Sequence, residues 1–149
     1  MATQMTTTSR EEMTRVNRRF IEIFQSGDVD AIDEVCAPNY VDHDPGPGQS
    51  PDREGLKQWL RSSRDSFSDI SFTVEDEIIE GDKLCVRSRF SGRHTGDFQG
   101  MPPTNKTVSI QSIDILRIEN GKAVEHWGVL DAAGMLQQLG MMPGPGPIA

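Results

Sequence analysis

Residues 92–104 read Gly92-Arg93-His94-Thr95-Gly96-Asp97-Phe98-Gln99-Gly100-Met101-Pro102-Pro103-Thr104, and this stretch is the most informative part of the 149-residue chain. It indicates a strand that runs into a long loop, which passes the chain to a second long strand over residues 106–118. Gly96 and Gly100 allow unusual φ angles, and Pro102-Pro103 stiffens the exit from the loop. Few soluble domains need so constrained a connection, so the loop marks a particular fold.

The spacing of apolar residues predicts the elements around this loop. A first helix is predicted from the Ser9-x-x-Glu12 capping box to Gly27, a short second helix over 28–36, and a third over about 51–67. After residue 69 the period changes to two, which predicts strands near 72–79, with an irregularity at Asp76, and over 84–90, 106–118 and 124–130. Asp131 is expected to cap a last helix over 132–139 that Gly140 ends.

Helices followed by consecutive antiparallel strands predict a single α+β domain over residues 9–140, with flexible tails at 1–8 and 141–149. A chain of this length can bury one core without a disulfide or a metal. Cys36 and Cys85 both fall in apolar phases, where a reduced cysteine behaves as a small hydrophobe.

Charge and composition exclude several classes of partner. The net charge of −8 argues against nucleic acid and anionic membranes, which would repel the chain. Residues 1–10 are polar, unlike a signal peptide, and no apolar run approaches the ~20 residues of a membrane span. We therefore expect a cytoplasmic protein that binds neither nucleic acid nor membrane.

Two polar residues interrupt the apolar alternation of the last two predicted strands. Asp114 shares its phase with Val108, Ile110, Leu116 and Ile118, and His126 shares its phase with Val124 and Leu130. A two-residue turn at Asn120-Gly121 would place Asp114 opposite Trp127, whereas a three-residue turn would place it opposite His126. The second register puts both apolar phases on one face, and we prefer it. A carboxylate beside an imidazole in an apolar pocket suits acid–base catalysis; the alternative is a structural pair.

Other polar and aromatic residues are weaker candidates. Asp42-His43-Asp44 precedes Pro45 and could line the mouth of a pocket, bind a metal or serve as a turn. His94 enters the loop and could face the pocket or pin the loop. The remaining expected substrate-binding residues are Ser112 and the aromatic side chains of Phe20, Trp59 and Trp127. Scattered histidines give no metal-ligand spacing, so no metal and no cofactor are expected.

The loop at 92–104, with Glu119-Asn120-Gly121-Lys122, Glu125-His126-Trp127 and Gln137-Gln138-Leu139-Gly140, resembles the SnoaL-like polyketide cyclases, or ester cyclases, in order and spacing. The resemblance covers roughly residues 11–140. It implies a cone-shaped barrel of a strongly curved sheet with three N-terminal helices and a short C-terminal helix, as in the nuclear-transport-factor-like superfamily. Cone-shaped relatives usually pair through the outer sheet face, which implies a homodimer or a higher homo-oligomer.

The resemblance implies an intramolecular aldol reaction that needs no cofactor and no metal. The family's catalytic Asp falls on Gly128, its pocket histidine on Asp114 and its pocket asparagine on Asp42, so the chain departs from the pattern at all three positions. We expect Asp114 and His126 to act on a small apolar carbonyl compound by aldol-type cyclisation or isomerisation. The alternatives are epoxide hydrolysis on the same fold, a non-catalytic binding protein for a hydrophobic metabolite, and an interaction module.

Overall fold

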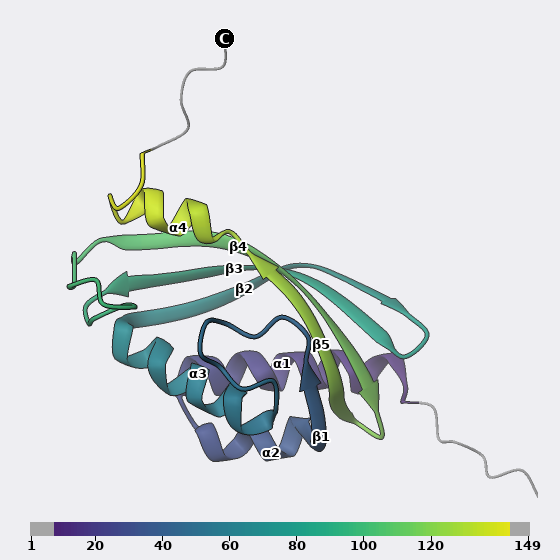
Figure 1. The fold of residues 1–149 in the computed structure, drawn as a ribbon. Helices are drawn as coiled ribbons and strands as arrows, with labels where there is room; N and C mark the ends of the chain where they lie inside the picture. Colours follow the sequence, from purple (N-terminus) through teal and green to yellow (C-terminus); the bar gives the residue numbers. More distant parts are fainter. Residues whose placement is uncertain (1–7, 144–149) are drawn as a thin grey trace, which may run out of the picture.

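The chain forms four α-helices, a short 3₁₀ helix and one sheet in a computed structural model that describes residues 8–143; residues 1–7 and 144–149 of the expected tails lie outside the described part. The element order is α1 (Arg10–Ser26), η1 (Val29–Ala31), α2 (Ile32–Val35), β1 (Cys36–Asp42), α3 (Arg53–Ser66), β2 (Phe67–Glu80), β3 (Lys83–His94), β4 (Thr107–Glu119), β5 (Lys122–Leu130) and α4 (Ala132–Gln138). Helices α1, α2 and α3 gather on one side of the sheet, and α4 lies against β4 (Figure 1).

The helices begin and end where their capping residues predict. Ser9 accepts a hydrogen bond from the Glu12 N–H at the start of α1, and Gly27 ends that helix in the left-handed region. Asp52 and Asp131 accept from the N–H groups of Gly55 and Gly134, which starts α3 and α4. None of the described helices is both long and apolar enough to cross a membrane.

The sheet has the strand order β1-β5-β4-β3-β2, and every pairing is antiparallel except that of β1 with β5. This confirms the α+β class and the curved, mainly antiparallel sheet (Figure 1). The sheet is open, with β1 and β2 at its edges, so the expected cone is a curved sheet and not a closed barrel. Strand β1 was not predicted, because Pro38 and the following Pro-Gly loop indicated irregular chain. Pro38 is tolerated because β1 is an edge strand.

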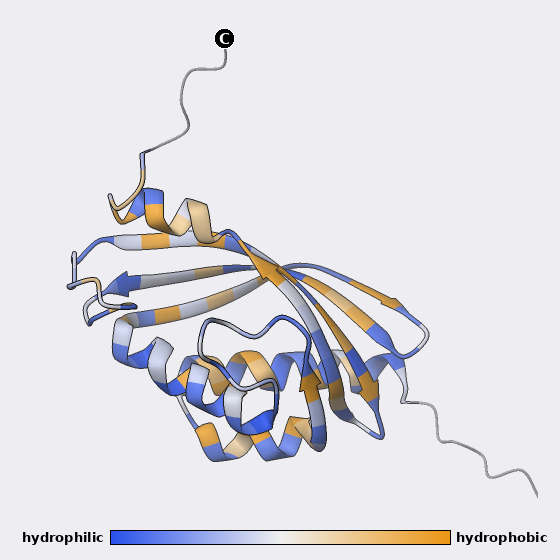
Figure 2. Ribbon diagram, in the orientation of Figure 1, coloured by the Kyte–Doolittle hydropathy of each residue, from blue (hydrophilic) through white to orange (hydrophobic). Residues whose placement is uncertain are grey.

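Hydrophobic and hydrophilic residues alternate along the strands (Figure 2). The larger core cluster joins α1, α2 and α3 to the sheet through residues such as Met13, Ile23, Leu60, Leu84 and Ile118. A smaller cluster joins Phe67, Val108 and Ile110 to Met135 and Leu139 near α4. The core therefore occupies the concave side of the sheet.

The loop between β3 and β4 is tightly anchored. The backbone N–H groups of Thr95 and Gly96 both donate to the carbonyl of Ser66, and the Ser66 hydroxyl donates to the carbonyl of Asp97. Gly96 is required for this approach, because a Cβ there would lie 1.9 Å from the carbonyl oxygen of Asp65. Gly100, with φ of 83°, provides the unusual backbone angle that the sequence predicted.

The register of β4 against β5 differs from both alternatives. A two-residue turn at Asn120-Gly121 starts the pairing, with Glu119 opposite Lys122. A bulge then leaves Val124 without a partner, so that Asp114 pairs with Gly128 and His126 with Leu116. The preferred three-residue turn was wrong; the bulge shifts the ladder by one residue in the opposite direction, and this shift also keeps Asp114 and His126 on one face.

Candidate active site

Three side chains from three strands meet on the concave face of the sheet. Nε2 of His126 lies 2.8 Å from Oδ1 of Asp114, and Nδ1 of His126 lies 3.0 Å from Oδ1 of Asp42. The predicted contact between Asp114 and His126 is therefore confirmed, although they are diagonal rather than opposite in the ladder. Asp42 was expected to bind substrate, whereas its carboxylate is buried against His126.

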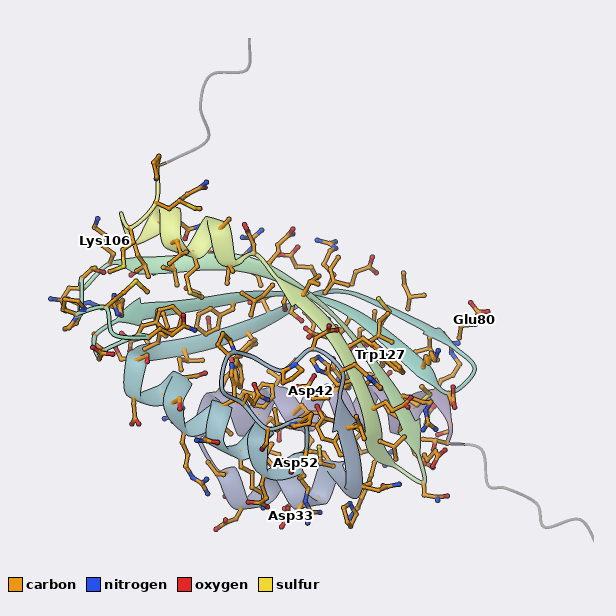
Figure 3. The ribbon with its side chains drawn as sticks, in the orientation of Figure 1. Asp33, Asp42, Asp52, Glu80, Lys106 and Trp127 are labelled. Atoms are coloured by element: carbon orange, nitrogen blue, oxygen red, sulfur yellow. The ribbon has the colours of Figure 1, made fainter. Side chains whose placement is uncertain are left out.

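The parallel pairing of β1 with β5 brings Asp42 to this position. Asp42 stands opposite His126 in the ladder, and the N–H of His43 donates to the His126 carbonyl. Oδ1 of Asp42 also accepts the N–H of Asp44, and Oδ2 lies 3.4 Å from Nε2 of Gln49. Asp42 thus ties β1 and the loop after it to the imidazole, near the middle of the molecule in Figure 3.

Two carboxylates around one imidazole keep His126 charged. Burial by itself would lower the pKa of His126, but the hydrogen bonds and negative charges of Asp114 and Asp42 outweigh burial and raise that pKa from 6.5 to about 9. Burial favours the protonated form of Asp42, yet the His126 contact dominates and holds the pKa of Asp42 below its usual value. At neutral pH both ring nitrogens of His126 therefore donate hydrogen bonds.

Asp114 is the most open member of this group. Its side chain is 31% exposed, compared with 20% for His126 and 5% for Asp42. Oδ1 accepts from His126, whereas Oδ2 has no hydrogen-bond partner within residues 8–143. One oxygen of Asp114 is therefore held in place while the other is available to a bound molecule.

Gly128 explains how a carboxylate from β4 can occupy this place. A Cβ at Gly128 would lie 2.4 Å from Oδ1 of Asp114 and 2.7 Å from Nε2 of His126. The space above β5 that a side chain at position 128 would fill is thus taken by the contact between Asp114 and His126. The N–H of Gly128 donates a hydrogen bond to Oδ2 of Asp44, which follows the end of β1.

The other expected site residues are dispersed. Trp127 lies on the opposite face, where its ring stacks on His43 at 4.7 Å and faces Nζ of Lys83 at 5.2 Å; its expected role in the pocket is wrong. Consecutive strand residues point to opposite faces, so a face shared with His126 was excluded. Phe20 is buried in the core, and half-buried Trp59 packs against that core. Ser112 is half-buried and in phase with Asp114.

His94 pins the loop between β3 and β4. Its Nδ1 accepts the N–H of Thr104 at 3.2 Å and lies 3.1 Å from the Thr104 hydroxyl. The side chain is fully buried beside Phe67 and Phe98, and its Nε2 has no hydrogen-bond partner among the described residues. Of the two roles considered for His94, the contacts favour anchoring of the loop.

Sequence reasoning missed two residues that border this site. Tyr40 precedes Asp42 by two positions on β1 and shares its face, and Ser88 pairs with Ser112 across β3 and β4. The alternation of Ser88 with Val86 and Phe90 could have identified it, since a hydroxyl on an apolar face is an exception like Asp114. Tyr40 gave no such signal because β1 was not predicted.

Two depressions are defined on the surface of the described residues. The two best-defined depressions measure about 370 and 240 Å³, and neither is lined by Asp114 or His126. The smaller one is lined by Gln111, Ser112 and Ile113 with residues 129–131 at the end of β5. Within residues 8–143, no group of three or more histidine, cysteine or acidic side chains is arranged to hold a metal ion.

Comparison with known proteins identifies the family. The chain is 31% identical over 126 residues to the nogalonic acid methyl ester cyclase of Streptomyces nogalater, covering 80% of this chain and 91% of that protein. It is 29% identical over 136 residues to an aklanonic acid methyl ester cyclase of Streptomyces peucetius, covering 87% and 91%.

A solved structure supports the same assignment. The structure of TsrD from Streptomyces laurentii superimposes with a TM-score of 0.83 at 31% identity and covers 90% of this chain and 98% of TsrD. The model of the SnoaL-like polyketide cyclases matches residues 14–139, which include the loop at 92–104 and every strand. The chain therefore belongs to the SnoaL-like polyketide cyclase family.

Proposed function

We propose that the protein is a cofactor-independent acid–base cyclase in which Asp114 moves the proton. The observation that carries this proposal is the state of the Asp114 carboxylate: Oδ1 is held 2.8 Å from His126, and Oδ2 is uncommitted on a partly exposed side chain. A carboxylate that is oriented but not fully neutralised can accept a proton from carbon and return it.

The proposed reaction is an intramolecular aldol cyclisation. Asp114 removes a proton from the carbon next to a carbonyl, and the resulting enolate attacks a second carbonyl of the same molecule. One carbon–carbon bond forms, the new alkoxide takes a proton, and Asp114 returns to the carboxylate. Substrate and product therefore have the same mass. An isomerisation would use the first proton transfer and return the proton at another atom.

His126 orients Asp114 in this proposal. Both of its N–H groups are engaged, one by Asp114 and one by Asp42, so neither is free for a substrate carbonyl. The Asp42 carboxylate keeps the ring protonated and fixed. This arrangement assigns His126 to positioning and, once the product alkoxide forms, to stabilising the carboxylate that Asp114 regains.

We propose an apolar, planar substrate. Seven aromatic side chains, of which Phe20 and Phe67 are buried, form a connected cluster with neighbouring ring centroids 5.3–5.8 Å apart: Phe20, Phe24, Trp59, Phe72, Phe90, Phe67 and Phe98. Aromatic faces and edges favour stacked or edge-on contact with other rings. The names of the relatives, which are methyl ester cyclases, suggest a polyketide methyl ester as the first substrate to test.

The test is turnover of nogalonic acid methyl ester and aklanonic acid methyl ester by the purified protein. The expected product has the same mass as the substrate and fewer exchangeable carbon-bound hydrogens. Mass spectrometry after incubation in D₂O measures both properties. Asp114→Asn keeps the shape and removes the base, so kcat should fall about 10²–10⁴-fold. Asp76→Asn, at an exposed position of β2, is the matched control and should leave kcat unchanged. Ligand binding without turnover or hydrogen exchange would support the non-catalytic alternative instead.

A further inference from the structure

An enolate needs a hydrogen-bond donor at its oxygen, and the residues described so far do not provide one. Charge that develops on a carbonyl oxygen is stabilised by donors placed at that oxygen before the reaction. His126 has no N–H left over, since Asp114 and Asp42 take both. Another donor beside Asp114 is therefore required if the site is to form an enolate.

Tyr40 lies next to this group on the concave face. It precedes Asp42 by two residues on β1, so both side chains project to the same side of the sheet. Its ring belongs to the core cluster and the residue is 3% exposed. Position 40 thus places a phenol on the face of the sheet that carries Asp42, His126 and Asp114.

The hydroxyl of Tyr40 is uncommitted. A buried tyrosine normally finds a hydrogen-bond partner for its O–H group. The Tyr40 hydroxyl has no hydrogen-bond partner within residues 8–143. In the same residues, Nε2 of His94 is the one side-chain nitrogen or oxygen atom that is both fully buried and without a partner. The Tyr40 oxygen therefore keeps some contact with solvent while its ring is buried.

The surroundings keep this phenol protonated. Burial raises the pKa of Tyr40 most, and the negative charge of Asp42, the Cys36 thiol and the negative charge of Asp114 raise it further. A phenol in this setting donates a hydrogen bond and does not compete with Asp114 as a base.

We propose that the Tyr40 hydroxyl donates a hydrogen bond to the substrate carbonyl oxygen whose neighbouring carbon loses its proton to Asp114. This inference rests on the proposed function, because the hydrogen bond contributes to catalysis only if Asp114 removes the proton. Asp114 would receive the proton at Oδ2 while the Tyr40 O–H stabilises the negative charge on the enolate oxygen. No proton leaves Tyr40, so the tyrosine is unchanged when the enolate attacks the second carbonyl.

Ser88 and Ser112 are the competing donors. They pair across β3 and β4 on the same face as Asp114, and neither hydroxyl has a partner among the described residues. A phenol is more acidic than an alcohol and is the stronger donor to an oxyanion. Ser88→Ala and Ser112→Ala therefore serve as comparison variants, with a smaller expected effect than Tyr40→Phe.

A binding experiment tests the donor without any turnover. Asp114→Asn removes the negative charge that would repel an oxyanion, and 2-naphthol serves as a planar enolate mimic whose two ionisation states differ in fluorescence. Adding Tyr40→Phe to Asp114→Asn should weaken naphthol affinity about tenfold, the usual effect of one hydrogen bond to a charged group. Affinity for naphthalene, which has no oxygen, should not change.

Several results of this experiment would overturn the proposal. These are unchanged naphthol affinity in Tyr40→Phe, equal weakening of naphthol and naphthalene, and no naphthol binding to Asp114→Asn at all. A loss that follows Ser112→Ala instead of Tyr40→Phe would overturn it as well. The melting temperature of Tyr40→Phe should match the wild type, because the hydroxyl has no protein partner to lose.

Kinetics separate this inference from the proposed function. With a methyl ester that is turned over, Tyr40→Phe should lower kcat about 10²-fold with little change in KM. If no ester is turned over but the naphthol effect follows Tyr40, the proposed function fails and the donor stands. If turnover requires Asp114 but neither kcat nor naphthol affinity responds to Tyr40→Phe, the donor fails and the proposed function stands.

Discussion

The charge state of His126 gives the sharpest test of the site geometry. Its pKa is raised from 6.5 to about 9 because Asp114 and Asp42 hold both ring nitrogens. At about 1.4 kcal/mol per pKa unit, this rise corresponds to roughly 3 kcal/mol of stability from the protonated form. That is a large share of the 5–15 kcal/mol that typically stabilises a domain.

The sign of the effect follows from linkage. The folded protein binds the His126 proton more tightly than the unfolded chain, so the stabilisation is complete below pH 6.5 and is lost as pH rises towards about 9. Asp42 acts at the other end, because its lowered pKa gives stability that disappears only as pH falls below about 4. The free energy of unfolding should therefore be greatest between about pH 4 and 6.5 and decrease above that range.

Urea unfolding from pH 5 to 10 measures this loss, and NMR titration of the imidazole signals measures the pKa directly. The His126 signal is assigned by its absence in His126→Gln, which distinguishes it from His43 and His94. Asp42→Asn removes one of the two carboxylates and should lower the pKa of His126, whereas Asp76→Asn should not. A His126 pKa at or below 6.5, or one indifferent to Asp42→Asn, would refute the reasoning.

Three further outcomes follow from packing. Gly128→Ala should separate Asp114 from His126, because its Cβ would lie 2.4 Å from Oδ1 of Asp114, and should lower both kcat and the His126 pKa; an unchanged NMR titration would contradict this. Gly96→Ala, with a Cβ 1.9 Å from a backbone carbonyl, should destabilise the fold by about 1–3 kcal/mol in urea unfolding, and unaltered unfolding would contradict the anchored loop. We expect a homodimer through the outer sheet face, where the paired Ile113 and Val129 are 45% and 69% exposed, and light scattering at micromolar concentration should show it; a monomer would count against it.

Much of the fold could be predicted from local sequence. Capping residues and the change of period near residue 69 gave the helices and four of the strands, because these signals depend on neighbours along the chain. Asp114 and His126 were recognisable as polar exceptions in apolar alternations, which needs no knowledge of the partner strand. The irregularity expected near Asp76 is also present, as a shift in the pairing of β2 with β3.

The tertiary structure decided how these residues meet. The bulge at Val124 sets the register of β4 and β5, and no local pattern distinguished it from a longer turn. The parallel pairing of β1 with β5 joins residues 84 positions apart and carries Asp42 onto His126. Such non-local pairing depends on how the whole sheet and its helices pack, so the chain alone determined which side chains are unusual, and only the folded sheet decided that Asp42, His126 and Asp114 form one group.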